Sequence, residues 1–357
     1  MKKEKRCIFC GNEFPKTKEH IISTGVIELT GDPRIQGIFG PYYENDHYEF
    51  KELPIKNFVF RACGSCNNDY SKLDGEAKNI IHKILQSKSL NHIDLNKLLT
   101  WFDKVRIGFR IALFQMKNQK ERILNHFYVN FNIQAKDRLL LIYKNKKIEN
   151  DFVVICANIP AFQYTPSCFA IKINNYGFIN ISEHYLISKK MGLPYAKDIS
   201  YFNELYPHAS TLIKGSKEAN YPILEEIYDR DCSEIYQINL SNNERKNIPT
   251  FYNDPYVKSF FKDDISELGN ILYYRNAQIK KYPPSKSLEW KPKVEKDLSD
   301  KDFLKLLTMQ TLKFQISLIS RYPIKIYDSK TSKRMEERKK RALETNRRIL
   351  TNIKYKM

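Results

Sequence analysis

The chain has 357 residues, 42% of them hydrophobic and 13% aromatic, and this composition excludes a globally disordered protein. Sixty Lys and Arg stand against 41 Asp and Glu, and the formal net charge of +19 favours a polyanionic partner. No run reaches the ~20 apolar residues of a membrane helix, and Gly11 to Pro15 break up any signal-peptide core, so we expect a cytoplasmic protein.

Four of the seven cysteines form two C-x-x-C pairs, Cys7 with Cys10 and Cys63 with Cys66. Disulfides are rare in a reducing compartment, and each C-x-x-C turn presents two thiolates on one side of a tight knuckle. The two pairs therefore predict one structural, tetrahedral zinc site, and the competing interpretation is a coincidental set of buried thiols. The other cysteines are predicted to be buried and inert: Cys156, Cys168 and Cys232.

Polar residues lie close to both cysteine pairs. Glu19 and His20 follow the first pair, and Asn67 comes directly after Cys66. Together the segments CIFC, KEHII, NFVFRACGSCNN and LDGE resemble the HNH, or ββα-metal, endonucleases, and especially the branch with four zinc cysteines and an EHII motif. The resemblance covers residues 7–76 only.

This resemblance implies a set of catalytic roles. His20 would be the general base that takes a proton from the attacking water, a role that suits an imidazole with an unperturbed pKa of about 6.5. Glu19 and Asn67 would be ligands of one catalytic cation, Mg²⁺ or Mn²⁺, at the scissile phosphate. Asn57 matches the middle Asn of the motif and would hold the loop that bears His20.

The chain departs from the family pattern in two ways. Glu19 stands where many members have Asp, and 42 residues separate His20 from Cys63, which is longer than in compact members. The insert over residues 31–50 is therefore expected to form an extra loop or hairpin beside the site.

Helices and then strands are predicted beyond the cysteine pairs. Ser71 and Asp74 fit a capping box, so a helix is expected from Ser71, and apolar residues at helical spacing predict a second helix over 94–119. Five short segments rich in β-branched and aromatic residues predict an antiparallel sheet over 126–190: HFYVNFNI, RLLLIYK, DFVVICANI, FAIKINN and GFINIS. Pro283 and Pro284 predict a loop, and a further helix is expected from Ser299 to Ser320.

The last segment, Lys330 to Met357, holds eleven Lys or Arg and three Glu and carries eight of the nineteen net charges. A helix is predicted here, either as a solvated face or as an element that contacts phosphates. Because Lys, Asn, Ile and Tyr are abundant throughout, the charge can also reflect the base composition of the gene. The predicted nucleic-acid contacts are Lys333, Arg334, Arg338, Lys339, Lys340, Arg341, Arg347 and Arg348.

These patterns predict an α+β protein in three parts. An HNH module with structural zinc is expected over 1–90, a mixed α+β domain over 91–330 that is helical to about 125 and strand-rich over 126–190, and a basic helical tail over 331–357. The expected function is a metal-dependent endonuclease that acts on DNA, although RNA stays open as a substrate.

Family members with such extensions commonly serve in defence against phage. A toxic nuclease needs restraint, so we expect control by the rest of the chain, by a regulatory protein partner or by a homo-oligomer. The alternative function is a zinc-stabilised nucleic-acid-binding protein without catalysis, in which Glu19, His20 and Asn67 would serve no chemical purpose.

Overall fold

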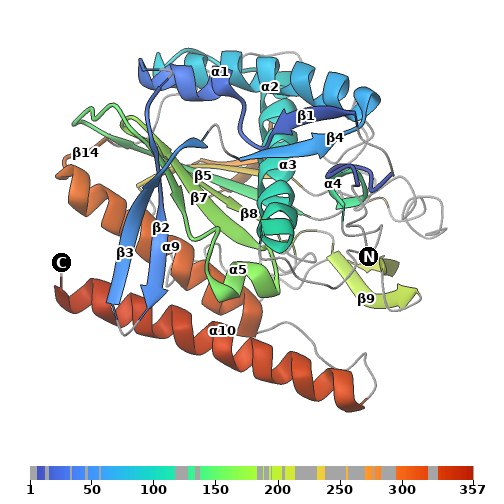
Figure 1. Ribbon diagram of the computed structural model, residues 1–357. Coiled ribbons are helices and arrows are strands. Elements are labelled where there is room, and N and C mark those ends of the chain that lie inside the picture. The colour runs from blue at the N-terminus through green and yellow to red at the C-terminus, as the bar shows by residue number, and fades with distance from the viewer. Residues whose placement is uncertain are drawn as a thin grey trace.

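The computed structural model shows a mixed α+β protein with a central sheet and helices on both of its faces (Figure 1), so the predicted class is confirmed. The structure describes residues 6–12, 16–32, 34–44, 47–55, 58–116, 128–132, 137–182, 188, 193, 195–202, 206–213, 231–237, 255, 270–275, 278–282, 295–320 and 329–356. The Pro283–Pro284 loop prediction lies outside these ranges.

The central sheet is built from strands that lie far apart in the sequence. Its strands are β2 (Gly37–Glu44), β3 (His47–Leu53), β5 (Arg138–Asn145), β6 (Phe152–Ile155), β7 (Cys168–Ile173), β8 (Tyr176–Ile181), β11 (Ser233–Gln237), β12 (Ile271–Arg275), β13 (Gln278–Lys281) and β14 (Glu295–Lys296). Their order is β13-β12-β11-β5-β8-β7-β6-β2-β3, with β14 beside β5. Strands β5 to β8 form the antiparallel core that the sequence predicted, and every residue of β6, β7 and β8 is buried.

The N-terminal insert contributes a hairpin to this sheet. Strands β2 and β3 pair antiparallel, and β2 also pairs in parallel with β6, where Ile38 lies opposite Val153. The backbone N–H of Cys156 donates to the carbonyl of Gly40 at 2.6 Å and extends this contact. The β2–β3 hairpin therefore belongs to the same sheet as β5 to β8.

The remaining elements flank this sheet. They are β1 (Thr17–His20), α1 (Thr24–Ile27), a 3₁₀ turn (Glu28–Thr30), β4 (Val59–Ala62), α2 (Gly64–Leu85), α3 (His92–Met116), α4 (Val129–Asn132), α5 (Pro160–Tyr164), β9 (Tyr195–Phe202), β10 (Tyr206–Ile213), α9 (Asp300–Ser320) and α10 (Ser329–Lys356).

Helices α3 and α9 cover opposite faces of the sheet. On α3, the Phe102 ring lies 6.2 Å from Phe169 and 5.8 Å from Phe178, centroid to centroid. Position 177 faces the opposite side of the sheet, because a Cβ built on Gly177 would lie 2.4 Å from Cδ2 of Leu307 on α9. Because neighbouring strand residues face opposite sides, positions 177 and 178 contact different helices.

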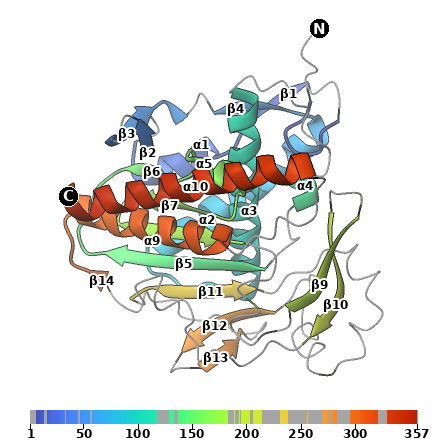
Figure 2. The same cartoon turned by 90° about the horizontal axis from the view of Figure 1, so that it is seen from below.

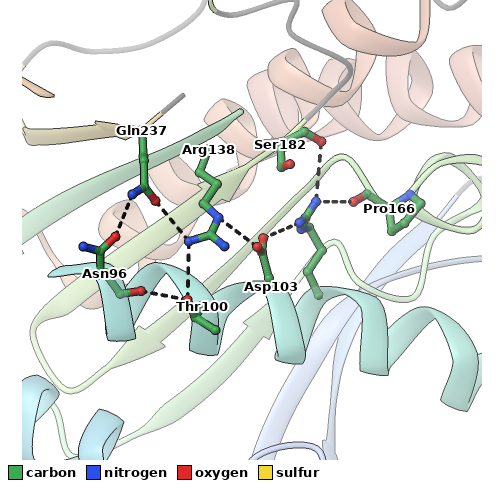
Figure 3. A network of polar contacts seen from close by, with 8 residues as sticks. Asn96, Thr100, Asp103, Arg138, Pro166, Ser182 and Gln237 are labelled. Carbon is green, nitrogen blue, oxygen red and sulfur yellow. Dashed lines mark hydrogen bonds and ion pairs between the residues drawn. The ribbon is translucent and has the colours of Figure 1, made fainter. Parts of the chain in front are cut away.

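A buried polar layer joins α3 to the sheet (Figure 3). Asp103 makes ion pairs with Arg106 on its own helix and with Arg138 on β5. The Arg138 guanidinium also donates to Gln237 at 3.1 Å, and the Gln237 amide donates to Asn96 at 2.6 Å. All five side chains are buried, so their contacts fix both the rotation and the axial position of α3 on the sheet.

Helix α10 packs on the outer side of α9 and against α5 (Figures 1 and 2). A chain of amides connects the two long helices to the sheet. The buried Asn346 donates to Gln315 at 2.8 Å, and Gln315 donates to the carbonyls of Cys168 at 2.7 Å and Cys156 at 3.1 Å. The predicted helical tail is thus a helix with one buried face. Among the described helices, none is both long and apolar enough to cross a membrane.

Two local predictions are wrong. Helix α2 begins at Gly64, with Cys63 as its N-cap, so Ser71 and Asp74 lie in the helix interior and form no capping box. The segment HFYVNFNI contains the helical turn α4 where a strand was predicted. In both cases tertiary contacts decide the outcome: Asp74 bonds to α3, and α4 lies against the cysteines. The predicted helices near 94–119 and after Ser299 correspond to α3 and α9.

Candidate metal centre and adjoining polar cluster

The two cysteine pairs converge at one point. The sulfur atoms of Cys7, Cys10, Cys63 and Cys66 all lie within 4.8 Å of one another. The Cys10 and Cys63 sulfurs are 3.8 Å apart. Tetrahedral zinc with Zn–S bonds of about 2.3 Å requires sulfur–sulfur separations of about 3.8 Å. The four residues therefore fit a zinc ion in both donor type and spacing, as the sequence predicted.

Local backbone contacts explain why the pairs meet. The first knuckle closes through a hydrogen bond from the Gly11 N–H to the Cys7 carbonyl, and Gly11 has a φ of 76°, which favours glycine. The Ile8 N–H then donates to the Arg61 carbonyl at 2.9 Å, which ties this knuckle to β4. Strand β4 ends one residue before Cys63, so the second knuckle starts beside the first.

The thiols differ in how readily they lose a proton. Burial raises the pKa of Cys10 to about 11, and it also raises the pKa of Cys66. Burial acts in the same direction at Cys63, but hydrogen bonds from the Cys66 backbone and the neighbouring thiols bring its pKa below the usual value. Metal ligation requires thiolates, so a metal ion that binds at these cysteines displaces thiol protons.

Glu19, His20 and Asn67 belong to the same strand–strand–helix unit as the cysteines. Strand β1 ends with Glu19 and His20 and pairs antiparallel with β4, where His20 lies opposite Val59. Strand β4 leads into α2, and Asn67 lies in its first turn, with its N–H donating to the Cys63 carbonyl at 2.9 Å. The unit thus brings the cysteine cluster, β1 and the start of α2 together.

Glu19 lies in a buried ionic cluster that the sequence did not reveal. Lys104 on α3 is fully buried, and its Nζ lies 2.7 and 2.8 Å from the two carboxylate oxygens of Asp74. The same Nζ lies 3.4 Å from Glu19 Oε1 and 3.3 Å from the His20 carbonyl. The ammonium also lies over the rings of Phe9 and Tyr70. Lys104 therefore joins α3 to the end of β1.

This environment shifts the ionisation of Glu19. Burial raises the pKa of Glu19 to about 7; Lys104 acts to lower the pKa, and Asp74 acts to raise it. Asp74 also accepts a hydrogen bond from the Trp101 indole at 2.9 Å. When Glu19 is ionised, two carboxylates face the single Lys104 ammonium, and the excess negative charge favours a further cation.

Asn67 lies on the same helix as Asp74, the α2 member of this cluster. Asn67 comes seven residues before Asp74, which puts both on the same side of α2, about 10 Å apart along its axis. Within the described ranges, the four cysteines are the one group of three or more His, Cys, Asp or Glu side chains close enough to share an ion. Asn57, the remaining predicted site residue, lies outside the described residues.

The predicted nucleic-acid contacts lie elsewhere. Helix α10 is on the far side of the sheet from β1 and α2 in both views (Figures 1 and 2). Lys339 is half-buried, and its Nζ donates to the Ser320 carbonyl at 3.1 Å. The other predicted contacts are exposed: Lys333, Arg334, Arg338, Lys340, Arg341, Arg347 and Arg348.

Four of these residues form a line along the helix, with Glu337 and Glu344 three or four positions away from members of the line. Arg334, Arg338, Arg341 and Arg348 share one face of α10, spanning about 21 Å, and we call them the arginine stripe. The adjacent exposed face mixes both signs of charge: Lys333, Glu337, Lys340, Glu344 and Arg347. The stripe thus presents four cations along one line of α10, which is an arrangement able to contact successive phosphates.

No protein-family model matches this chain, and no curated protein or solved structure has significant similarity to it.

Proposed function

We propose that the protein is a metal-dependent endonuclease of the HNH type, which hydrolyses phosphodiester bonds in DNA. The observation that supports this most is the strand–strand–helix unit, in which Glu19 and His20 end one strand and Asn67 lies in the first turn of the helix beside the cysteine cluster. The order of these elements along the chain, with the cysteine pairs beside them, is the order in which the family motif places its residues.

In this proposal each residue has one role. His20 accepts the proton of the attacking water, and the Lys104 contact with its carbonyl holds the end of β1 in place. Glu19 and Asn67 would bind the catalytic Mg²⁺ or Mn²⁺, which would stabilise negative charge on the leaving oxygen. Zinc at the cysteines is structural.

Nicking of supercoiled plasmid tests the catalytic role of His20. The full-length, zinc-loaded protein is incubated with DNA and Mg²⁺ or Mn²⁺, and wild type is compared with His20→Ala. We expect wild type to nick DNA and His20→Ala to lose at least about 100-fold in rate, the usual contribution of a general base. Zinc content is measured in every sample so that loss of fold is recognised.

The matched control is His82→Ala. His82 is an exposed residue of α2 and bonds to Gln86, so its removal leaves the proposed site intact. We expect His82→Ala to cut like wild type. Equal cutting by His20→Ala and wild type would contradict the proposal, and the same assay with RNA identifies the preferred substrate.

A second candidate function is a zinc-stabilised nucleic-acid-binding protein without catalysis. The observation that favours it is the Lys104 ammonium, which already neutralises part of the buried charge of Glu19 and Asp74. In this case Glu19 holds α3 against β1. DNA binding by wild type without cutting in Mg²⁺ or Mn²⁺, and with an unchanged affinity in His20→Ala, would select this function.

A further inference from the structure

The helical turn α4 lies directly on the cysteine cluster, although it is far from it in the sequence. The Nδ2 of Asn130 donates to the Cys66 sulfur at 3.5 Å. The backbone N–H of Asn130 donates to the carbonyl of Phe9 at 2.9 Å, and Phe9 lies between Cys7 and Cys10. Asn130 therefore contacts both knuckles, one through its side chain and the other through its backbone.

The orientation of the Asn130 amide is fixed by a second contact. The Tyr70 hydroxyl donates to Asn130 Oδ1 at 2.7 Å, which directs Nδ2 toward the sulfur. Tyr70 is itself held by the Phe9 ring, which stacks on it with centroids 4.1 Å apart. The neighbouring Tyr128 and Val129 are buried and anchor the turn. The N–H···S contact is thus part of a packed arrangement.

We propose that Asn130 is a positioning residue for the metal at the four cysteines, and that metal binding fastens residues 128–132 onto the knuckles. Four thiolates around one divalent cation carry a net charge of −2, and an N–H donor withdraws electron density from the sulfur it contacts. The contact therefore favours the metal-bound thiolate, as hydrogen bonds to metal ligands generally do. The proposal requires metal at the cysteines and does not require nuclease activity.

The rate of zinc release tests the proposal. Zinc-loaded, full-length protein is mixed with an excess of a chromogenic zinc chelator. The absorbance of the zinc–chelator complex is followed over time and gives the rate of zinc release. Asn130→Ala removes the donor, and Asn130→Asp keeps the side-chain shape but places a carboxylate beside the sulfur. We expect both to release zinc about 10- to 100-fold faster than wild type, with Asp the faster of the two.

The control is the same Asn→Ala substitution at a position away from the cysteines. Asn79→Ala changes an exposed residue of the same helix that carries Cys66, and we expect it to release zinc at the wild-type rate. Release rates of Asn130→Ala and Asn130→Asp equal to those of Asn79→Ala would overturn the proposal. If both Asn130 variants fail to fold, Tyr70→Phe decides, because it keeps the ring but lets the amide turn. The proposal then requires that Tyr70→Phe release zinc faster than wild type.

Cobalt supplies a readout that altered packing alone would not move. Co²⁺ bound to four thiolates absorbs through charge transfer from sulfur to metal. Loss of the N–H···S bond raises the donor level of the Cys66 sulfur, so this band should move to longer wavelength in Asn130→Ala and stay in place in Asn79→Ala. An unmoved band in Asn130→Ala counts against the proposal.

Discussion

The Lys104 side chain is the cation of a buried charge cluster beside the candidate site. Its ammonium faces Asp74 and Glu19, both of which are at least 90% buried. A buried ion pair adds little over an apolar substitute, but removal of one partner leaves an uncompensated charge. Two carboxylates share this one cation, so its loss is especially costly.

Substitution of Lys104 tests this dependence. We expect Lys104→Met to lower the free energy of unfolding by about 3–5 kcal/mol, because Asp74 and Glu19 lose their counter-ion. Adding Asp74→Asn to this variant should restore part of the loss. The measurement is urea denaturation at pH 8 with zinc present.

Lys78→Met is the control for this experiment. Lys78 makes a half-exposed pair with Glu28, for which a change of at most about 1 kcal/mol is expected. Similar losses for Lys104→Met and Lys78→Met would refute the role given to the buried ammonium.

Some of the residues in this region could be identified from the sequence, and others could not. The cysteines could be grouped because C-x-x-C spacing is itself the signature of a metal knuckle. Lys104 could not, because it is 85 positions from Glu19, and one lysine within a helical pattern does not indicate its partner. Aromatic and β-branched neighbours dominate the segment of Asn130 and predict a strand there, whereas the residue lies in the helical turn α4.

At the scale of elements, a second buried lysine connects the sheet to α9. Lys172 on β7 is 1% exposed and pairs with both Asp151 and Asp300, the first residue of α9. Burial raises the pKa of Asp151 to about 6; Lys172 acts to lower the pKa, and Asp300 acts to raise it. In the unfolded chain an Asp has a pKa near 4. Its stabilising contribution is therefore complete below about pH 4 and is lost as the pH rises through about 6.

Asp300→Asn should weaken this pH dependence. The substitution removes the like charge near Asp151, so the pKa of Asp151 falls toward its usual value, and less stability is lost between pH 5 and pH 7.5. Urea denaturation at both pH values gives the difference for each protein. Asp297→Asn, at an exposed position just before α9, should keep the wild-type difference. No difference between the two variants would disprove the link.

Elements with local signals were predictable, and elements set by distant contacts were not. Strands β7 and β8 follow from short β-branched segments separated by a turn. The parallel pairing of β2 with β6 joins residues more than a hundred positions apart, and no local pattern encodes it. Ser71 and Asp74 have the spacing of a cap but lie inside α2, so the sequence predicts a start seven residues after the actual one at Gly64.

At the scale of the whole molecule, the candidate site and the arginine stripe lie on opposite sides of the sheet (Figures 1 and 2). In the proposed nuclease, the stripe would therefore contact phosphates remote from the scissile one. Phosphate contacts of this kind supply affinity without sequence preference and depend strongly on salt.

Removal of two stripe arginines tests its contact with nucleic acid. For Arg338→Ala with Arg341→Ala we expect weaker binding to duplex DNA, and a salt slope reduced by about 0.9 for each lost phosphate contact. The comparison is Lys146→Ala with Lys147→Ala, which removes the same charge from exposed positions after β5. Fluorescence anisotropy across a salt series measures both. Equal slopes for the two double variants would exclude a specific role of the stripe.

The position of Lys104 on α3 has a consequence for dissection of the chain. A fragment that ends near residue 90 would contain every motif residue that resembles the nuclease family, yet it would lack the ammonium between Asp74 and Glu19. It would also leave β2 without its neighbour β6. The motif residues therefore do not form a self-contained unit. Transferred to another protein, they would need a cation from that protein to take the place of Lys104 between Asp74 and Glu19.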